Sequence, residues 1–278
     1  MLVNLKPVLT EAKMNKYAVG AFNVYNYETI KGVVESVREL KIPAVIAFGE
    51  RYIENMQFKE VFALVDTMIK DLEIPVVLHL DHCKSFENII RAIRAGFTSV
   101  MFDGSELPFE ENVKRTEKIV AVARAAGVSV EAELGSIAAG RGSSEEGYRE
   151  IYTDPAQAEE FVESTGVDAL AVSIGTVHGI YKGEPRINMD VLKEVASRVD
   201  IPLVLHGGSG TPEGIIKECI KNGICKINVN TEISLYTLKK IKEMLADEGD
   251  CHLSRVSLKE VEYIKDVVKK YMLLFYNA

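Results

Sequence analysis

The chain alternates short apolar runs with amphipathic stretches along most of its length, and this alternation constrains the fold more than any other feature. The runs predict eight strands, at residues 19–24, 44–48, 75–81, 99–103, 128–134, 169–174, 202–206 and 224–230. A repeated strand–helix order favours a parallel sheet, because each helix can return the chain to the start of the next strand. Eight repeats in 278 residues favour closure into an α/β (β/α)8 TIM barrel over an open doubly wound sheet.

The segments between the strands have the periodicity of helices. YETIKGVVESVREL and NVKRTEKIVAVARAAG, for example, place apolar residues three and four positions apart, as an amphipathic helix requires. Asp154–Pro155 and Thr211–Pro212 each place a capping oxygen before a proline, which predicts two helix starts. The stretch from Leu258 to about Phe275 predicts an extra C-terminal helix outside the barrel. No break in composition divides the chain, so we expect a single domain over residues 1–278.

The composition argues against several classes of partner. A net charge of −8 gives a polyanion no favourable field, so we expect no nucleic-acid partner and no anionic membrane surface. The start, MLVNLKPVLTEAKMNK, has no continuous apolar core, and no stretch approaches the roughly 18 apolar residues of a spanning helix. The four cysteines form no CxxC pair, which is typical of reduced thiols in a cytosol. We therefore expect a cytoplasmic protein.

Four of the five histidines lie at or just beyond predicted strand ends. His79 and His82 occur in VVLHLDH, His178 in AVSIGTVHG and His206 in LVLHGGSG. Imidazole is the commonest neutral ligand of zinc, and a catalytic zinc takes three protein ligands and keeps one position open. Any one of these histidines alone also fits a core position with a local partner. Because the carboxyl ends of barrel strands meet at one rim, His82, His178 and His206 together predict a metal site there.

Other polar residues follow the same strand ends. They are Asn23, Asp81, Asp103, Glu133, Asn228 and Asn230. After the seventh strand, HGGSGTPEG places glycines where backbone N–H groups can approach an anion, and the next helix adds its positive end. Phosphate sites in such barrels often form from the loops after strands seven and eight. The pattern predicts a phosphorylated small molecule as the ligand.

The motifs HLDHC, SVMFDGS, VEAELG, TVHG, LVLHGGSG and KINVNTE, in this order, resemble those of the class II (zinc-dependent) fructose-bisphosphate and tagatose-bisphosphate aldolases over about residues 3–240. The resemblance implies a catalytic zinc on His82, His178 and His206, with Asp81 as the acid/base. It also implies a second or alternative metal position at Asp103 and Glu133. The substrate-binding residues that we expect, counting Asn23 at the first strand end, are Asn23, Gly179, Gly207, Gly208, Ser209, Asn228, Val229, Asn230 and Thr231.

The activity that the resemblance implies is reversible cleavage of a ketose 1,6-bisphosphate into dihydroxyacetone phosphate and an aldehyde. With fructose 1,6-bisphosphate, the first expectation, the aldehyde is glyceraldehyde 3-phosphate, and tagatose 1,6-bisphosphate is the next candidate. Relatives also imply a homodimer or homotetramer, a monovalent cation (Na⁺ or K⁺) near the phosphate, and a loop carboxylate, here Glu145 or Glu146. Many relatives carry a small hydroxyl residue after the second strand, whereas this chain has Gly49 and Glu50. Either Arg51 replaces that phosphate donor, or the aldehyde lacks the phosphate.

Three other interpretations stay open at this point. A Schiff-base aldolase would use Lys226, which shares its side of the eighth strand with Asn228. A metal-dependent hydrolase would show an HxH pair on the first strand, where this chain reads AFNVYN. A non-catalytic phosphosugar-binding protein would keep the pocket without the reaction. We expect His79 to support the metal ligands from behind, and His252 to lie on the surface.

Overall fold

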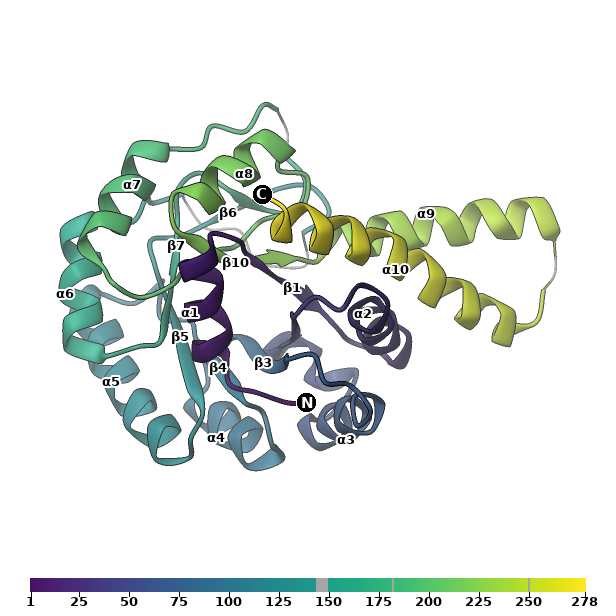
Figure 1. Cartoon of the computed structure of the whole chain (residues 1–278), viewed down its shortest axis with the longest axis horizontal. Helices are drawn as coiled ribbons and strands as arrows, with labels where there is room; N and C mark the ends of the chain where they lie inside the picture. Colours follow the sequence, from purple (N-terminus) through teal and green to yellow (C-terminus); the bar gives the residue numbers. More distant parts are fainter. Residues whose placement is uncertain (144–149, 182, 250) are drawn as a thin grey trace.

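Eight parallel strands close into a barrel, which confirms the predicted (β/α)8 fold. The computed structural model describes residues 1–143, 150–181, 183–249 and 251–278. The strands neighbour one another in the order β1-β10-β9-β7-β5-β4-β3-β2 (Figure 1). Their bounds are β1 Val19–Asn23, β2 Ala44–Gly49, β3 Val76–Cys83, β4 Ser99–Phe102, β5 Ser129–Leu134, β7 Ala169–Val172, β9 Leu203–Leu205 and β10 Ile224–Val229. Two short strands, β6 Ala138–Ala139 and β8 Val177–His178, pair separately from the barrel.

Helices surround the barrel and connect its strands (Figure 1). They are α1 Leu5–Asn15, α2 Tyr27–Leu40, the 3-10 helix η1 Glu50–Glu54, α3 Phe58–Met68, α4 Phe86–Ala95, α5 Phe109–Ala125, α6 Pro155–Thr165, α7 Met189–Arg198, α8 Glu213–Lys221, α9 Thr231–Glu248 and α10 Leu253–Tyr276. Asp154 caps α6 as predicted, because its side chain accepts the backbone N–H groups of Ala156 and Gln157. The predicted cap at Thr211 is wrong: α8 begins at Glu213, and the Thr211 hydroxyl donates instead to the carbonyl of Gly207.

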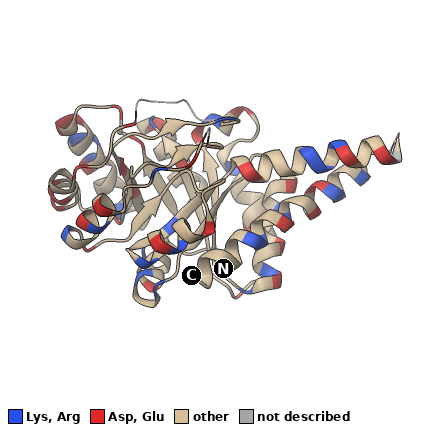
Figure 2. Ribbon diagram, turned by 90° about the horizontal axis from the view of Figure 1, so that it is seen from above, with Lys and Arg blue, Asp and Glu red and all other residues tan. Residues whose placement is uncertain are grey.

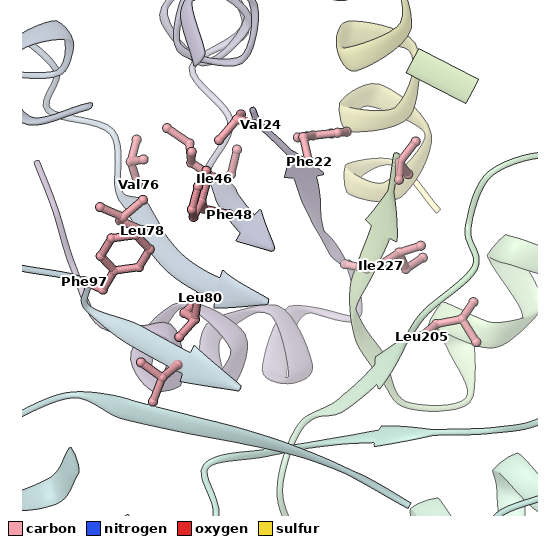
Figure 3. Packing of buried hydrophobic residues seen from close by; sticks show 14 of the residues in the cluster. Phe22, Val24, Ile46, Phe48, Val76, Leu78, Leu80, Phe97, Leu205 and Ile227 are labelled. Atoms are coloured by element: carbon pink, nitrogen blue, oxygen red, sulfur yellow. The ribbon is translucent and has the colours of Figure 1, made fainter. Parts of the chain in front are cut away.

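Alternate residues of each strand point to opposite sides of the barrel wall, and this gives the protein two apolar layers. Phe22, Ile46 and Leu78 point outward and pack beneath the helices (Figure 3). Residues such as Val45 and Val77 point inward and form a second cluster, which α1 completes with Leu5 and Leu9. Figure 1 shows α1 lying across this end of the barrel. α1 and the inward side chains fill one end of the barrel, and the polar residues that follow the strands lie at the opposite end, beside two cavities.

Strand and helix bounds differ from the prediction at several places. β7 and β9 are shorter than the predicted runs 169–174 and 202–206, while β3 extends to Cys83. The last helix begins at Leu253 rather than Leu258, since His252 is its N-cap and accepts the backbone N–H of Ser254. The prediction missed α1. Its apolar positions are few and separated by polar residues, so the sequence pattern indicates a helix only weakly. Packing against the end of the barrel stabilises it.

The two last helices form a hairpin that projects beyond the barrel (Figure 1). α10 packs closely on α2, where a Cβ on Gly32 would lie 2.5 Å from Cγ2 of Ile264. Acidic and basic residues are interspersed along the projecting helices (Figure 2). Among the residues that the structure describes, no helix combines the length and the apolar character needed to cross a membrane.

Candidate active site

Three histidines meet at the open end of the barrel. His82 comes from the end of β3, His206 directly follows β9, and His178 belongs to the short strand β8 at the rim. Their ring centroids lie 4.5 Å apart for His82 and His206, 5.1 Å for His82 and His178, and 6.1 Å for His178 and His206. One nitrogen from each ring lies within 4.8 Å of the others. The structure therefore brings together the predicted ligands, although they come from separate parts of the chain.

The backbone of β3 is irregular at His82, and this irregularity serves the site. His82 has a φ of 44°, in the left-handed region that a residue with a side chain adopts at a cost. The pairing of β3 with β4 shifts register between Leu80 and Cys83. In a regular strand the neighbours Asp81 and His82 would point to opposite sides, whereas a bulge re-aims one of them. As a result both side chains line the same cavity.

Asp81 is held as a buried, ionised carboxylate. Its two oxygens accept hydrogen bonds from the side-chain amides of Asn23 (2.8 Å) and Asn228 (3.0 Å), and only 2% of the residue is exposed. Burial alone would raise its pKa, but the neighbouring His82, Lys226 and His206 hold the pKa of Asp81 well below its usual value. A carboxylate fixed in this way can accept a proton from a substrate hydroxyl.

Two further carboxylates, Asp103 and Glu133, lie beside the histidines. Asp103 Oδ2 is 3.0 Å from Nδ1 of His82, and Glu133 Oε2 is 3.4 Å from Nδ1 of His206. Burial, followed by the charge of Asp103, raises the pKa of Glu133 well above its usual value. His82, Asp103 and Glu133 also form a second group whose potential ligand atoms lie within 4.8 Å of one another.

This donor set fits a divalent cation. His206 Nδ1 and Glu133 Oε2 are buried, and neither has a hydrogen-bond partner among the described residues. Burial is the main cause that lowers the pKa of His206 and of His178, so both rings are neutral at neutral pH and offer lone pairs. Unsatisfied buried donors and acceptors are costly, and a cation among them would remove that cost. Three imidazoles next to carboxylates are ligands that suit zinc.

Behind the histidines lies a residue that the sequence analysis overlooked. Glu131 is completely buried, and its Oε1 lies 3.0 Å from both His206 Nε2 and Lys226 Nζ. Strand alternation could have found it, because Glu131 and Glu133 are two residues apart and share the inward side of β5. His79 lies in the same layer, where its Nδ1 is 2.8 Å from the Ser99 hydroxyl, and its support of the metal ligands stays a prediction. The ion pair with Glu131 occupies the Lys226 ammonium, which argues against the Schiff-base interpretation.

The loops after β9 and β10, where the sequence predicts a phosphate site, lie together beside the smaller cavity. Gly207 has a φ of 74°, and a Cβ there would lie 2.4 Å from the carbonyl oxygen of Val177, so only glycine fits. The Ser209 hydroxyl accepts the backbone N–H groups of Asn230 and Glu232. α9 begins at Thr231, which lines the smaller cavity, so the positive end of an 18-residue helix adjoins these loops. The start of α8 at Glu213, the end that the sequence suggested, follows the β9 loop as well.

The predicted substrate-binding residues divide into two groups. Most of them line one small cavity together with Asp81, and these are Asn23, Gly179, Gly207, Ser209, Asn228, Asn230 and Thr231. The other two do not line it: Gly208 packs against Ile227, and the Val229 side chain is buried in the core beneath the helices. The backbone N–H of Gly208 also donates to the carbonyl of Asn228, so it connects the two loops.

A second, larger cavity of about 240 Å³ meets the first at His82 and His178. Its outer wall contains Gly49, Glu50, Arg51, Lys84, Asp103 and Ser105. Glu50 serves a structural role there, since its carboxylate accepts hydrogen bonds from the backbone N–H of Lys84 and the side chain of Asn88. His82 and His178 thus stand between two cavities, whereas His206 is buried beside them. The predicted loop carboxylates, Glu145 and Glu146, lie outside the described residues.

A barrel with imidazoles and carboxylates gathered at the carboxyl ends of its strands is typical of a metal-dependent enzyme. Comparison with known proteins narrows this class. The family model for fructose-bisphosphate aldolase class-II matches residues 3–278. The fructose-bisphosphate aldolase of Staphylococcus epidermidis is 43% identical over 274 residues, covering 96% of this chain and 95% of the relative. A probable fructose-bisphosphate aldolase of Bacillus subtilis is 44% identical over 256 residues, covering 90% of this chain and 88% of the relative.

Solved structures agree with this result. The crystal structure of the YdjI aldolase from Escherichia coli K12 matches with a TM-score of 0.88 and 37% identity, covering 99% of this chain and 97% of that one. A putative fructose-1,6-bisphosphate aldolase from Coccidioides immitis matches with a TM-score of 0.89 and 29% identity, covering 98% of this chain and 96% of that one. The chain belongs to the class II fructose-bisphosphate aldolases, which are carbon–carbon lyases of carbohydrate metabolism.

Proposed function

We propose that this chain reversibly cleaves fructose 1,6-bisphosphate into dihydroxyacetone phosphate and glyceraldehyde 3-phosphate, with tagatose 1,6-bisphosphate as the second candidate substrate. One observation carries the proposal: His82 and His178 line both of two adjoining cavities, and Asp81 lines the smaller one beside them. A ketose bisphosphate has two halves joined at the bond to be broken, and each half would occupy one cavity. Membership of the aldolase family supports the bisphosphate as substrate.

The metal in this proposal is one zinc ion on His82, His178 and His206. Their nitrogens are close enough together to share an ion, and His206 Nδ1 is buried without a protein partner among the described residues. When bound, zinc supplies a Lewis acid that polarises the ketone carbonyl and stabilises the charge left by cleavage. Asp103 and Glu133 form the second or alternative metal position, which the group they make with His82 supports.

Asp81 acts as the acid/base. In cleavage its carboxylate takes the proton of the C4 hydroxyl while the C3–C4 bond breaks, and in condensation it returns that proton. Asn23 and Asn228 hold its two oxygens, so the base is oriented before substrate arrives. Because Asp81 is ionised at neutral pH, it needs no prior loss of a proton.

The phosphate of the dihydroxyacetone half binds in the smaller cavity. Gly179, Gly207 and Ser209 provide close backbone approach there, and the helix that begins at Thr231 contributes its positive end. Gly208, Val229 and Asn230 shape this cavity: the backbone N–H of Gly208 donates to the carbonyl of Asn228, that of Asn230 donates to the Ser209 hydroxyl, and Val229 anchors the strand end in the core. A monovalent cation, Na⁺ or K⁺, would help to balance this charge.

The aldehyde half binds in the larger cavity, and Arg51 holds its phosphate. Among the described residues that line that cavity, Arg51 and Lys84 carry long basic side chains, and Arg51 follows β2 directly after Gly49 and Glu50. If Arg51 has this role, Arg51→Ala lowers kcat/KM for fructose 1,6-bisphosphate much more than for fructose 1-phosphate. Arg115→Ala is the matched control, since Arg115 pairs with Glu111 on the outer face of α5, away from both cavities.

Assembly and location complete the proposal. α9 exposes three leucines on the projecting hairpin, Leu235, Leu238 and Leu245, each at least 40% accessible. Burying such side chains against another copy is favourable, which supports a homodimer or homotetramer. The sedimentation of the purified protein measures this directly. A role in carbohydrate metabolism and four unpaired cysteines are in keeping with a cytoplasmic protein.

The experiment that tests the function compares turnover of fructose 1,6-bisphosphate, tagatose 1,6-bisphosphate and fructose 1-phosphate by the zinc-loaded protein. We expect the highest kcat/KM for fructose 1,6-bisphosphate. A preference for its C4 epimer would correct the substrate. Preference for fructose 1-phosphate would show that the aldehyde carries no phosphate, and no cleavage of any of them would reject the proposed activity.

A further inference from the structure

A layer of four fully buried polar residues lies inside the barrel, between the candidate metal centre and the apolar end filled by α1. The four are His79 on β3, Ser99 on β4, Glu131 on β5 and Lys226 on β10, each with 0% exposure. Lysine and glutamate are almost never fully buried without a partner, because removing a charge from water is costly. Here the two charges pair: Lys226 Nζ lies 3.0 Å from Oε1 and 2.9 Å from Oε2 of Glu131.

The pair acts on one imidazole in particular. Glu131 Oε1 lies 3.0 Å from Nε2 of His206, whereas Glu131 Oε2 is 3.8 Å from Nε2 of His79, beyond hydrogen-bond distance. A carboxylate oxygen can only accept a hydrogen bond, so Nε2 of His206 must be the protonated nitrogen. A neutral imidazole has a single N–H, and Nδ1 is therefore the nitrogen with the lone pair. That atom is buried beside Glu133 and has no hydrogen-bond partner among the described residues.

Lys226 orients the Glu131 carboxylate that accepts the hydrogen bond from His206. By contacting both oxygens it fixes the plane of Glu131, and so it places Oε1 against His206. It also supplies the opposite charge that a buried carboxylate requires. The side chain of Lys226 is too deeply buried to meet the substrate, and its partner Glu131 lies on the side of His206 away from Nδ1. Neither residue is in reach of the reacting atoms.

We propose that Glu131 and Lys226 are positioning residues, which hold His206 in the tautomer whose Nδ1 faces the metal. The inference rests on the proposed zinc site and deepens it, since it explains how a buried histidine presents the correct nitrogen. The general effect is known in size: removing the hydrogen-bond partner of a metal-binding histidine weakens metal affinity by about 10–100-fold.

Two double variants test the role of the acceptor alone. Glu131→Gln with Lys226→Met, and Glu131→Leu with Lys226→Met, both remove the ion pair without leaving a lone buried charge. They have the same net charge and similar volumes, but only glutamine keeps an oxygen that can accept from His206. The readouts are the zinc dissociation constant, measured by competition with a chelator, and the absorption spectrum after cobalt substitution. Ser99→Ala is the control, because Ser99 belongs to the same layer and contacts His79 rather than His206.

We expect the glutamine variant to bind zinc within about tenfold of the original protein, and the leucine variant to bind it about 10–100-fold more weakly. The cobalt spectrum should change only in the leucine variant. Equal zinc affinity in the two double variants would overturn the inference. If the original protein binds no zinc at all, the proposed metal site fails instead, so the two failures are distinguishable.

A measurement on the unaltered protein covers the case in which the leucine variant does not fold. With ¹⁵N-labelled histidine, NMR of the metal-free protein reports which nitrogen of His206 carries the proton. We expect a slowly exchanging proton on Nε2 and an unprotonated Nδ1, with the signal assigned by its loss in His206→Gln. A proton on Nδ1 would contradict the inference, whatever metal the protein binds.

Discussion

Asp81→Asn separates the proton-transfer role of Asp81 from its structural role. Asparagine has nearly the same shape, but it cannot act as a base, and loss of general acid–base catalysis typically costs 10²–10⁴-fold in rate. By the usual conversion this is about 3–5 kcal/mol of transition-state stabilisation. We therefore expect kcat for fructose 1,6-bisphosphate to fall by about 10²–10⁴-fold.

The cost to stability should be small by comparison. The new amide N–H₂ would face a side-chain amide donor, but the Asn228 Oδ1 atom has no partner among the described residues. Turning the Asn228 amide over would let this oxygen accept from the new group. Exchanging charge-assisted for neutral hydrogen bonds then costs about 1–2 kcal/mol, which corresponds to roughly 2–8 °C in Tm for a chain of this size.

The assay measures three quantities on the same protein: steady-state turnover, zinc content by mass spectrometry, and Tm. Zinc content should equal that of the original protein, because Asp81 is not among the three proposed ligands. A variant that keeps kcat within tenfold of the original would refute the role of Asp81 as base. A variant that loses zinc together with turnover would show that Asp81 supports the metal instead.

Three other changes have defined outcomes. His206→Ala should lose zinc and activity together, and zinc analysis of the purified variant checks this. Gly207→Ala should raise KM strongly, because the new Cβ would lie 2.4 Å from a carbonyl oxygen, at a position with a φ of 74°. The control is Gly214→Ala, since Gly214 has open space around it. This control should raise the free energy of unfolding by about 0.5–1 kcal/mol through helix propensity. Glu232→Gln should lower Tm at pH 7. Burial raises the pKa of Glu232, but hydrogen bonds from Tyr271 and Lys270 hold this pKa below its usual value. The ionised carboxylate therefore stabilises the fold above about pH 4.3, and the difference in Tm between the variant and the original protein should vanish as the pH falls below that value.

The strand–helix alternation was enough to predict the barrel, because a period of two and a period of 3.6 are visible in single segments. The bulge at His82 was not visible. It depends on how β3 pairs with β4, and no local pattern in LHLDHC indicates a φ of 44°. The start of α8 was also wrong: the helix begins at Glu213, and the Thr211 hydroxyl donates to the carbonyl of Gly207 instead of capping it.

At the site, residue types and their places at strand ends identified the residues that the structure brings together. The sequence could not predict which side chains of different strands contact one another inside the barrel. Glu131 meets His206 and Lys226 across the inside of the barrel, from positions 75 and 95 residues away. Only closure of the barrel makes them neighbours. The aldehyde side was also difficult to predict, because the hydrogen bonds of Glu50 to Cys83 and Lys84 at the end of β3, and to Asn88 of α4, depend on how these elements meet.

The central claim is that three imidazoles hold one zinc ion on which cleavage depends. Removing metal with a chelator and titrating zinc back, while following cleavage of fructose 1,6-bisphosphate, tests it most directly. We expect no activity without metal and full recovery at one zinc per chain. Full activity in the metal-free protein, together with trapping of the substrate on a lysine by borohydride, would contradict it.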